Sequence, residues 1–431
     1  MEALEDGHQS KKARIAMLHY SGPPVVGGVE TVIVAHAKLF YKNGYDVTLI
    51  AGRELKPIPG LHNVVEPLID SNNIRINIIN RALDKGEVPA DFAYLENQIF
   101  ERLYALLKGY TACIVHNVFT LHKNLALTAA LLRLAQVLPT KFIAWCHDLA
   151  WTNQLYLTVL YERYPWNLLK TSDAKITYIA ISPQRQQEIL TILKPTLAAS
   201  KVPVVPNGID LTDFLSIDPP SQELIRAAGL DKALYQGATL FLLPSRITRR
   251  KNIELAIEII AALKKQNYHV NLIVTGPPGP HNPKNDEYVR ELLTLRQRLD
   301  VVAEVNFLIE SWQDEAGLPK PVTDTHIAAL YRFCDAMLMP SSQEGFGIPI
   351  LEAGLARLPI FCTDLEPFHE LALEDATYFA VSTEPTYIAT IIMQKLAADP
   401  AYRLRRRVLA NFTWDSIFYQ KIEPLVKEDL H

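Results

Sequence analysis

Short apolar runs alternate with amphipathic stretches along almost the whole chain. Arg14–Tyr20 precedes a helical pattern over Val29–Asn43 and a further apolar run over Asp46–Ala51. Strand-sized runs separated by helix-sized stretches are typical of βαβ units, whose strands are parallel. The sequence therefore predicts an α/β protein built on parallel sheets with helices on both faces. Further strands of the first half are expected over 112–116, 141–146, 177–181 and 202–205.

The alternation breaks once, and the break divides the chain. After a polar, proline-containing stretch the pattern resumes at Ala238. A chain of 431 residues is too long for a single hydrophobic core, and its 49% of hydrophobic residues can fill two. We therefore predict a disordered tail over 1–12, an N-terminal Rossmann-like domain over 13–205, a linker over 206–236, a second Rossmann-like domain over 237–410 and a C-terminal helix over 411–431.

Charge and composition disfavour several classes of protein. The net charge of −4 argues against a general nucleic-acid binder, although residues 13–205 are net basic, which favours an anionic acceptor or an anionic lipid surface. No apolar run reaches the roughly 18 residues of a membrane span, and residues 1–12 lack the apolar core of a signal peptide. We expect a cytoplasmic protein with at most a peripheral contact to the inner face of the membrane. The four widely spaced cysteines are interpreted as reduced packing residues.

Two glutamates bracket a glycine loop in the second half. The run Glu-Gly-Phe-Gly-Ile-Pro-Ile-Leu-Glu spans 344–352, and its proline fits the first turn of a helix. Gly345 and Gly347 let backbone amides approach a ligand, and Glu352 lies about two helical turns beyond Glu344. We interpret the loop as a grip for a sugar nucleotide, with one carboxylate for sugar hydroxyls and the other for a ribose. The alternative is a surface turn followed by an ordinary helix.

Two cations follow the strand with which the second half begins. Arg246 stands just after that strand, and Lys251 comes five residues later, at the start of a helix. A diphosphate at this edge would meet both cations and the positive end of the helix, and no metal would be needed. Gly276 opens a proline-rich loop after the next strand, where ligands sit in open α/β sheets. The alternative interpretation of the two cations is a solvated basic patch.

A second glycine loop precedes the first helix. Gly27 and Gly28 lack the spacing of a dinucleotide fingerprint, so they favour a phosphate or a reacting sugar over NAD. We find no cluster with the spacing of metal ligands and no motif for a nucleophilic serine or cysteine. The sequence therefore predicts neither a metal ion nor a cofactor.

Polar pairs follow two other strands of the first half. His147 and Asp148 come directly after the strand at 141–146, where either could bind sugar hydroxyls or help an acceptor lose its proton. His116 and Asn117 end another strand and are a weaker case. A packed histidine and a capping aspartate are the alternative interpretation.

In their order along the chain, these motifs resemble those of family 4 glycosyltransferases, which are retaining enzymes of the GT-B fold. The resemblance covers nearly the whole chain, and it is most specific over 340–353. It implies two Rossmann-like domains facing across a cleft, the first for the acceptor and the second for the nucleotide sugar. The helix at 411–431 would cross back to the first domain. The resemblance rests on Gly27-Gly28-Val29-Glu30, His147-Asp148, Pro206-Asn207-Gly208-Ile209-Asp210, Arg246 with Lys251, and the 340–353 run.

The resemblance also implies a role for each candidate residue. Arg246 and Lys251 would hold the diphosphate, Glu344 would hold the donor sugar, and His147 would lie at the reaction centre. No metal ion would be required. The other donor-binding residues would be Gly27, Gly28, Gly276, Gly345, Phe346, Gly347, Ile348 and Glu352, and those on the acceptor side would be His116, Asn117 and Asp148.

The chain departs from the family pattern in two places. Asn252 stands where many relatives have glycine, and Ala353-Gly354-Leu355-Ala356-Arg357 stands where many have Ala-Met-Ala-Ala-Gly, so that Arg357 replaces a glycine. Neither change touches a charged candidate residue, so they put the fine preference for a donor in doubt more than activity.

The leading hypothesis is transfer of a hexosyl group, with retention, from a UDP- or GDP-linked sugar to a hydroxyl of a sugar, glycan or lipid-linked acceptor. A sugar-nucleotide epimerase is one alternative, because such enzymes can share a two-domain architecture. An inactive scaffold or binding subunit of the same fold is another.

Overall fold

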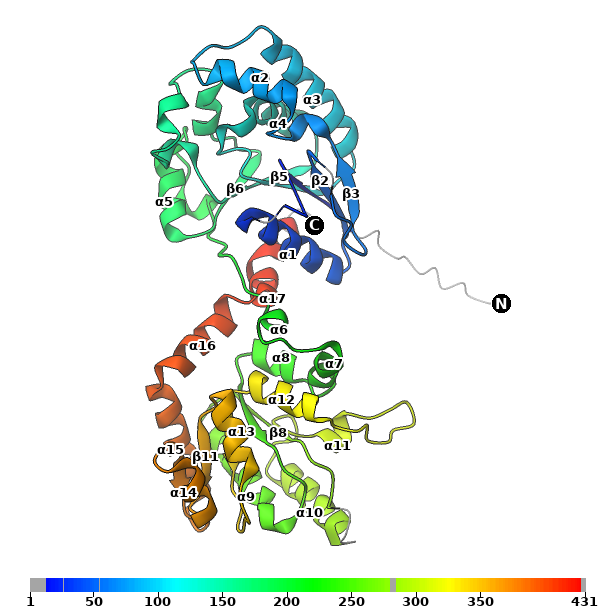
Figure 1. The fold of residues 1–431 in the computed structure, drawn as a ribbon, viewed down its shortest axis with the longest axis vertical. Helices are drawn as coiled ribbons and strands as arrows, with labels where there is room; N and C mark the ends of the chain where they lie inside the picture. The colour runs from blue at the N-terminus through cyan, green and yellow to red at the C-terminus, as the bar shows by residue number, and fades with distance from the viewer. Residues whose placement is uncertain (1–12, 26, 54, 280–283, 428–431) are drawn as a thin grey trace, which may run out of the picture. The chain divides into compact units, whose positions relative to one another are not determined.

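The computed structural model describes residues 13–25, 27–53, 55–279 and 284–427. Within these ranges it contains two six-stranded parallel sheets, each with helices on both faces (Figure 1). The predicted α/β class with two Rossmann-like sheets is confirmed.

The chain divides into two compact units. Unit 1 comprises Met1–Gly208 together with Trp414–His431, and unit 2 comprises Ile209–Thr413. Each unit contains one sheet, so each can be described by itself.

The sheet of unit 1 has the strand order β3-β2-β1-β4-β5-β6. This order reverses direction between β1 and β4, the place where the carboxyl ends of parallel strands leave a crevice for ligands. The strands are β1 (Arg14–His19), β2 (Asp46–Ala51), β3 (His62–Val65), β4 (Ala112–His116), β5 (Lys141–Cys146) and β6 (Ile176–Ala180).

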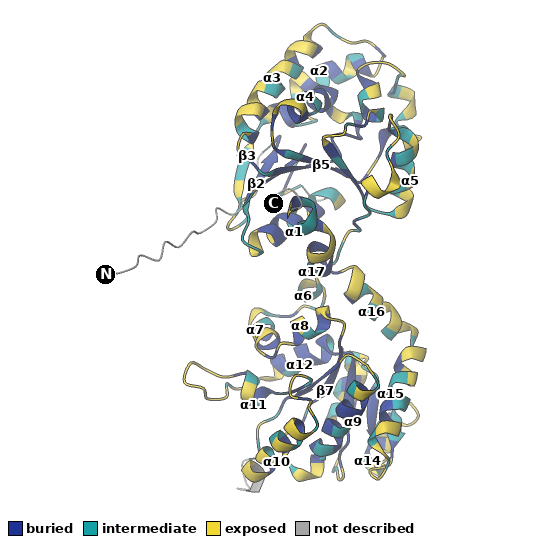
Figure 2. Ribbon diagram, turned by 180° about the vertical axis from the view of Figure 1, so that it is seen from behind, coloured by how far each residue is buried: buried dark blue, intermediate teal, exposed yellow. Residues whose placement is uncertain are grey.

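Successive side chains of these strands enter two different cores. Ala16 and Leu18 of β1 pack on one face with α2, α3 and α4, whereas Ile15 and Met17 pack on the other face with α1. This alternation is the period-two pattern of a strand buried on both faces, and Figure 2 shows the strands as buried. The main helices are α1 (Gly28–Lys42), α2 (Ile74–Leu83), α3 (Asp91–Leu107), α4 (Leu125–Val137) and α5 (Pro183–Ile192).

The sheet of unit 2 repeats the same topology. Its order is β12-β11-β10-β7-β8-β9, so the reversal falls between β7 and β10. The strands are β7 (Thr239–Leu243), β8 (Val270–Val274), β9 (Val305–Phe307), β10 (Ala336–Met339), β11 (Ile360–Thr363) and β12 (Thr377–Phe379).

Helices cover both faces of this second sheet as well. Phe241 and Leu243 of β7 pack with α9 and α15, while Leu240 and Leu242 pack with α7, α8 and α12. The helices are α6 (Leu211–Phe214), α7 (Pro219–Ala227), α8 (Leu230–Tyr235), α9 (Ile253–Lys265), α10 (Lys284–Arg298), α11 (Leu308–Ser311), α12 (Asp324–Phe333), α13 (Ile348–Ala356), α14 (Glu366–Ala372), α15 (Pro385–Ala398) and α16 (Pro400–Asn411).

The predicted linker over 206–236 is wrong. Most of this segment forms α6, α7 and α8, and Leu224, Ile225, Leu230 and Leu234 are buried in the core of unit 2. The prolines that suggested a linker stand at the start of α7, where a missing N–H costs nothing.

The strand predicted over 202–205 does not form either. Val204 makes an isolated bridge to Ala180, the last residue of β6, and the regular ladder ends there. The apolar residues of this run are explained by packing, since Val202 and Val205 are buried in the two cores of unit 1.

The C-terminal segment packs within unit 1. It begins with α17 (Trp414–Ile417), continues as a π-helical turn over Phe418–Ile422 and ends in α18 (Glu423–Lys427). Phe418 and Ile422 share a core with α1, and the hydroxyl of Tyr45 donates a hydrogen bond to Glu423 at 2.9 Å. The predicted helix over 411–431 therefore starts later, because residues up to Thr413 belong to unit 2.

Candidate functional site

The candidate residues fall into two groups, one at the carboxyl edge of each sheet. In unit 1, His116 is the last residue of β4 and His147 immediately follows β5. His116 pairs in register with Trp145, so His147, two residues further, lies on the same face as Trp145. Nδ1 of His116 lies 3.0 Å from Nε2 of His147, and the two rings are stacked. The structure thus brings these two predicted residues into direct contact.

Asn117 fixes the backbone that carries His147 and Asp148. It adopts a left-handed conformation with φ of 61°, which asparagine tolerates better than most residues. Its side-chain oxygen accepts hydrogen bonds from the backbone N–H of His147 at 2.8 Å and of Asp148 at 3.0 Å. Asn117 is 3% exposed, so in this structure it supports the loop that carries the other two residues.

Two further residues, His19 and Glu30, join this edge, and our sequence analysis did not select them. His19 ends β1, and its Nδ1 lies 2.9 Å from the carbonyl oxygen of His116. Its Nε2 lies 4.0 Å from a carboxylate oxygen of Glu30, which also accepts a hydrogen bond from Ser21 at 2.8 Å. For His19 the signal was a polar residue at the end of an apolar strand, the same signal that selected His116, whereas Glu30 lies in the first turn of α1.

The glycine loop of unit 1 contains two different kinds of glycine. A Cβ at Gly27 would lie 2.3 Å from Oε2 of Glu30, so the position of this carboxylate requires Gly27. A Cβ at Gly28 would meet nothing within 4 Å. Gly28 therefore leaves open space beside the start of α1, where a helix N-terminus favours an anion.

Burial keeps the histidines of this edge neutral at physiological pH. It lowers the pKa of His147 to about 4, with smaller effects from His19 and Asp148. It also lowers the pKa of His36 to about 3, and it holds the pKa of His116 well below its ordinary value. The unprotonated form is favoured because charging an imidazole away from water is costly.

In unit 2, Glu344 accepts hydrogen bonds from two cations. It is contacted by the ammonium of Lys251 and, at 2.9 Å, by Nη1 of Arg250. The Lys251 and Glu344 side chains are only 10% and 9% exposed. Burial opposes ionisation of the carboxyl, but the bonds from Lys251 and Arg250 outweigh it and hold the pKa of Glu344 below its ordinary value. The structure therefore brings Lys251 and Glu344 together from opposite sides of the switch point.

Arg250 was missed by our sequence analysis. Its guanidinium is half exposed, but one nitrogen holds Glu344. Its backbone oxygen also accepts hydrogen bonds from the backbone N–H and the hydroxyl of Ser342, and so ties the turn after β7 to the loop after β10. No local pattern could reveal a contact across more than ninety residues.

Arg246 and Gly276 occupy neighbouring turns after β7 and β8. Arg246 is exposed, and its guanidinium has no hydrogen bond or ion pair within the described ranges of the chain. A Cβ at Gly276 would lie 2.3 Å from the carbonyl oxygen of Ser245, so glycine is needed where the two turns touch. Arg246 is therefore available to an anion, and Gly276 shapes the turn beside it.

The loop over 344–352 has the geometry expected of a helix-opening loop. Gly347 has φ of 104°, a conformation that strongly favours glycine, and α13 follows it. Phe346 and Ile348 are exposed, and Gly345 has open space where a side chain would be. Glu352, one of the residues predicted to bind the donor, accepts a hydrogen bond from the hydroxyl of Tyr331 at 2.8 Å. Tyr331 thus orients this carboxylate.

The two departures from the family pattern keep a glycine-like backbone. Asn252 has φ of 49° and Arg357 has φ of 58°, both in the left-handed region. Asparagine is tolerated there, whereas arginine is strained.

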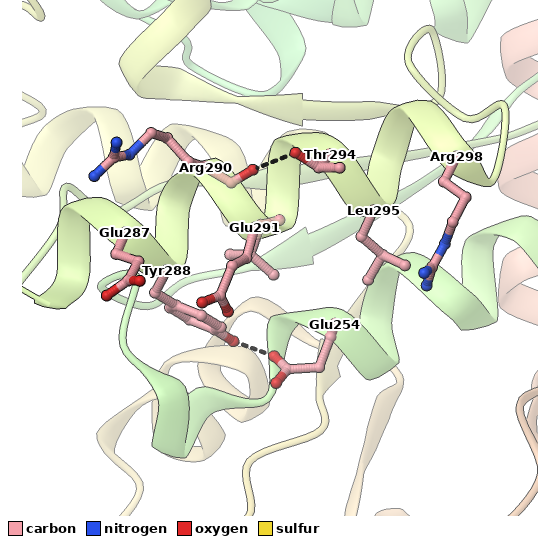
Figure 3. A pocket seen from close by; sticks show the side chains of 9 residues that line it. Glu254, Glu287, Tyr288, Arg290, Glu291, Thr294, Leu295 and Arg298 are labelled. Carbon is pink, nitrogen blue, oxygen red and sulfur yellow. Dashed lines mark hydrogen bonds between the residues drawn. The ribbon is translucent and has the colours of Figure 1, made fainter.

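A separate hollow of about 520 Å³ lies between α9 and α10 (Figure 3). Within it the hydroxyl of Tyr288 donates a hydrogen bond to Glu254. None of the predicted site residues lines this hollow, whose walls are formed by Glu254, Glu287, Tyr288, Arg290, Glu291, Leu292, Thr294, Leu295 and Arg298.

Two kinds of feature are absent from the described part of the chain. Within the described ranges, no three His, Cys, Asp or Glu side chains are grouped so that they could hold a metal ion. No helix in that same part of the chain is both long and apolar enough to cross a membrane.

Family comparisons agree with the two-unit division. The model described as "Glycosyltransferase Family 4" matches residues 26–213, and the model described as "Glycosyl transferases group 1" matches residues 231–408. The chain belongs to glycosyltransferase family 4. The two models match the two units, whose sheets share one topology, so the chain is a GT-B protein of two Rossmann-like domains. By its family it is a hexosyltransferase.

Several named glycosyltransferases are similar to this family 4 chain. A mannosylglucosylglycerate synthase from Thermotoga maritima is 24% identical over 82% of this chain and 81% of its own length. One of the same name from Petrotoga mobilis is 27% identical over 62% of each chain. An α-1,3/1,6-mannosyltransferase from Homo sapiens is 26% identical over 46% of this chain and 44% of its own.

Among solved structures, a sucrose-phosphate synthase from Thermosynechococcus elongatus is 16% identical, with a TM-score of 0.37. The alignment covers 97% of this chain and 98% of that one. A superposition this loose carries no argument about function.

Proposed function

We propose that this family 4 enzyme transfers a hexosyl group from a UDP- or GDP-linked sugar to an acceptor hydroxyl, with retention and without a metal ion. The observation that carries the proposal is the Lys251–Glu344 pair at the switch point of unit 2, with the exposed Arg246 nearby in sequence. A nucleotide diphosphate is the ligand whose charge suits these two cations, and Lys251 also contacts Glu344 in the loop that leads into α13.

Each residue of unit 2 has a distinct part in the proposal. Lys251 and Arg246 would bind the diphosphate and stabilise the negative charge that builds on it as the sugar departs. Glu344 would accept hydrogen bonds from hydroxyls of the donor sugar, and its two cationic partners keep it ionised for that task. Glu352, oriented by Tyr331, would accept a bond from a ribose hydroxyl.

The acceptor would bind at the carboxyl edge of unit 1. His147 and Asp148 stand there on a loop held by Asn117. Small polar, oligosaccharide and lipid-linked acceptors all fit this chemistry. Two of the relatives are named for mannosylglucosylglycerate and one for mannosyl transfer, so a mannosyl donor and a small anionic acceptor are the first to test.

Binding of nucleotides tests the donor site directly. UDP, GDP, ADP, TDP and their glucose, mannose and N-acetylglucosamine derivatives would be compared by thermal shift on the wild type and on Glu352→Ala. We expect one base family to stabilise the wild type more than the variant, since only a ligand that binds the folded state raises the melting temperature. If no nucleotide binds, an inactive scaffold replaces this proposal.

Turnover tests the remaining points. Product formed from the donor alone would indicate an epimerase, whereas transfer to an acceptor supports the proposal. The anomeric configuration of the product, read by NMR, decides between retention and inversion. EDTA is expected to leave the rate unchanged, and a loss that Mg²⁺ restores would contradict a metal-free reaction.

A further inference from the structure

Four histidines from different elements meet in unit 1, and the proposed function uses only one of them. His19 ends β1, His36 lies on α1, His116 ends β4 and His147 follows β5. Each is less than 9% exposed. The contact between Nδ1 of His116 and Nε2 of His147, at 3.0 Å, is the hydrogen bond that directly involves the proposed catalytic ring.

A hydrogen bond between two neutral imidazoles fixes the tautomers of both. If Nδ1 of His116 donates, Nε2 of His147 is unprotonated and His147 carries its proton on Nδ1. If Nε2 of His147 donates, His116 must carry its own proton on Nε2, and Nδ1 of His147 is left as an acceptor. The surroundings of His116 decide between these arrangements.

Nε2 of His116 is buried and has no hydrogen-bond partner among the residues that the structure describes. The ring of Trp145 is stacked on His116 at 5.9 Å between centroids, and its own indole N–H is also buried without a partner. Indole can only donate, so a proton on Nε2 of His116 would add a second orphaned donor to the same dry aromatic cluster. A bare Nε2 avoids this, and the proton of His116 then lies on Nδ1.

We infer that His116 is a positioning residue that donates from Nδ1 to Nε2 of His147 and thereby makes His147 present an Nδ1–H to the substrate. This inference rests on the proposed function, because it assumes that His147 faces the acceptor or the donor sugar. It narrows the role of His147 to a hydrogen-bond donor toward a substrate oxygen. In this tautomer Nδ1 cannot take up the proton that the acceptor loses, so that proton goes to another base.

The groups around His147 are compatible with a neutral ring. They are His19 from β1, Glu30 from α1, His116 from β4, Asp148 from its own loop and Arg185 from α5. Burial is the largest cause that lowers the pKa of His147; His19 and Arg185 lower it further, whereas Asp148 and Glu30 raise it. His36, on the far side of His116, is also neutral because burial lowers its pKa to about 3.

The tautomer can be observed without any substrate. The full chain would be labelled with ¹⁵N-histidine, and two-bond ¹H–¹⁵N correlation spectra recorded near pH 7.5, with His147→Asn and His116→Asn used to assign the two rings. We expect both rings to have a protonated Nδ1 and a bare Nε2. A proton on Nε2 of His147 overturns the inference whatever the enzyme turns out to transfer.

Kinetics test whether this tautomer matters for turnover. His116→Phe keeps a ring but removes the donor, and should lower kcat about 10- to 100-fold, a size seen when an outer partner that orients a histidine is lost. His116→Asn keeps an N–H near the position of Nδ1 and should retain most of the rate.

The matched control is His36→Phe. It lies in the same aromatic cluster, with its ring in contact with Trp145, but makes no bond to His147. It should keep the tautomer of His147 and a kcat near that of the wild type. If His116→Phe turns over normally, or if His116→Phe and His36→Phe lose activity equally, His116 has only a packing role. Should His116→Phe fail to fold, the wild-type spectrum still decides.

Discussion

The donor site that we propose in unit 2 is centred on two side chains. Lys251 and Glu344 come from turns after β7 and β10 and are almost fully buried as a pair. A buried pair of this kind is costly to disrupt, because removal of one partner leaves an uncompensated charge. In this structure Glu344 contacts the ammonium of Lys251. Under the proposed function, a bound diphosphate would share that cation with the carboxylate.

Replacement of Lys251 by alanine tests its part in the reaction. We expect Lys251→Ala to lower kcat by roughly 10²- to 10³-fold, because the departing phosphate loses a preorganised countercharge. Steady-state rates, with the melting temperature measured in parallel, check this. Arg249→Ala is the matched control, since Arg249 lies in the same turn but pairs with Glu291 on the exposed surface. Equal rates in the two variants would remove Lys251 from the mechanism.

The buried histidines should make unit 1 sensitive to acid. The folded pKa of His36 is about 3 and that of His147 about 4, both below the ordinary value near 6.5. Between about pH 6.5 and pH 4 the unfolded chain therefore binds protons that the folded chain does not. The free energy of unfolding has its full value above this window. It decreases as the pH is lowered through the window, by up to about 1.4 kcal/mol per pH unit for each such histidine.

Urea unfolding at pH 7, 6 and 5 measures this slope. His36→Phe should fall less steeply than the wild type, because one of the contributing groups is gone. Identical slopes would mean that His36 is not held neutral by burial.

At the ends of two helices, residues other than glycine stand where many relatives have glycine. The turn before α9 has Asn252 in a left-handed conformation, and α13 ends at Arg357 in the same conformation. Both positions keep the backbone that the family provides with glycine, so the loops retain their course. At Arg357 this costs strain energy.

Restoring glycine at the end of α13 should stabilise unit 2. We expect Arg357→Gly to raise its free energy of unfolding by about 1 kcal/mol, because glycine adopts positive φ without a steric penalty. Thermal and urea unfolding check the gain. Arg357→Ala keeps the penalty and should be close to the wild type. A gain shared equally by both variants would point to the loss of charge and not to the backbone.

Over the whole chain, the boundary between the units lies earlier than the sequence indicated. Unit 2 begins at Ile209, and α7 and α8 fill one face of its core. A fragment over 209–413 should therefore fold with a cooperative transition. A fragment over 237–413, cut at the end of the predicted linker, should expose the surface that Leu224 and Leu234 cover, and aggregate. Circular dichroism and light scattering compare the two, and equal behaviour would contradict the assignment of α7 and α8 to this core.

Much of this architecture was visible in the sequence because it is encoded locally. Period-two and period-3.6 patterns of apolar residues specify each strand and helix, and Gly347, Arg246 and His147 stand where strands end and helices begin. Local patterns failed at Val202–Val205 and at Pro219, where an apolar run pairs with no full strand and a proline starts a helix. In both places tertiary packing overrides the local signal.

The sequence was sufficient for the fold class, the motifs and the candidate residues at the edges of the strands, because these depend on short-range spacing. The folded chain was needed to show that Arg250 holds Glu344, that Tyr331 orients Glu352 and that His116 contacts His147. Each of these contacts joins residues from separate strands, turns or helices, and only the packing of these elements in the folded chain brings them together.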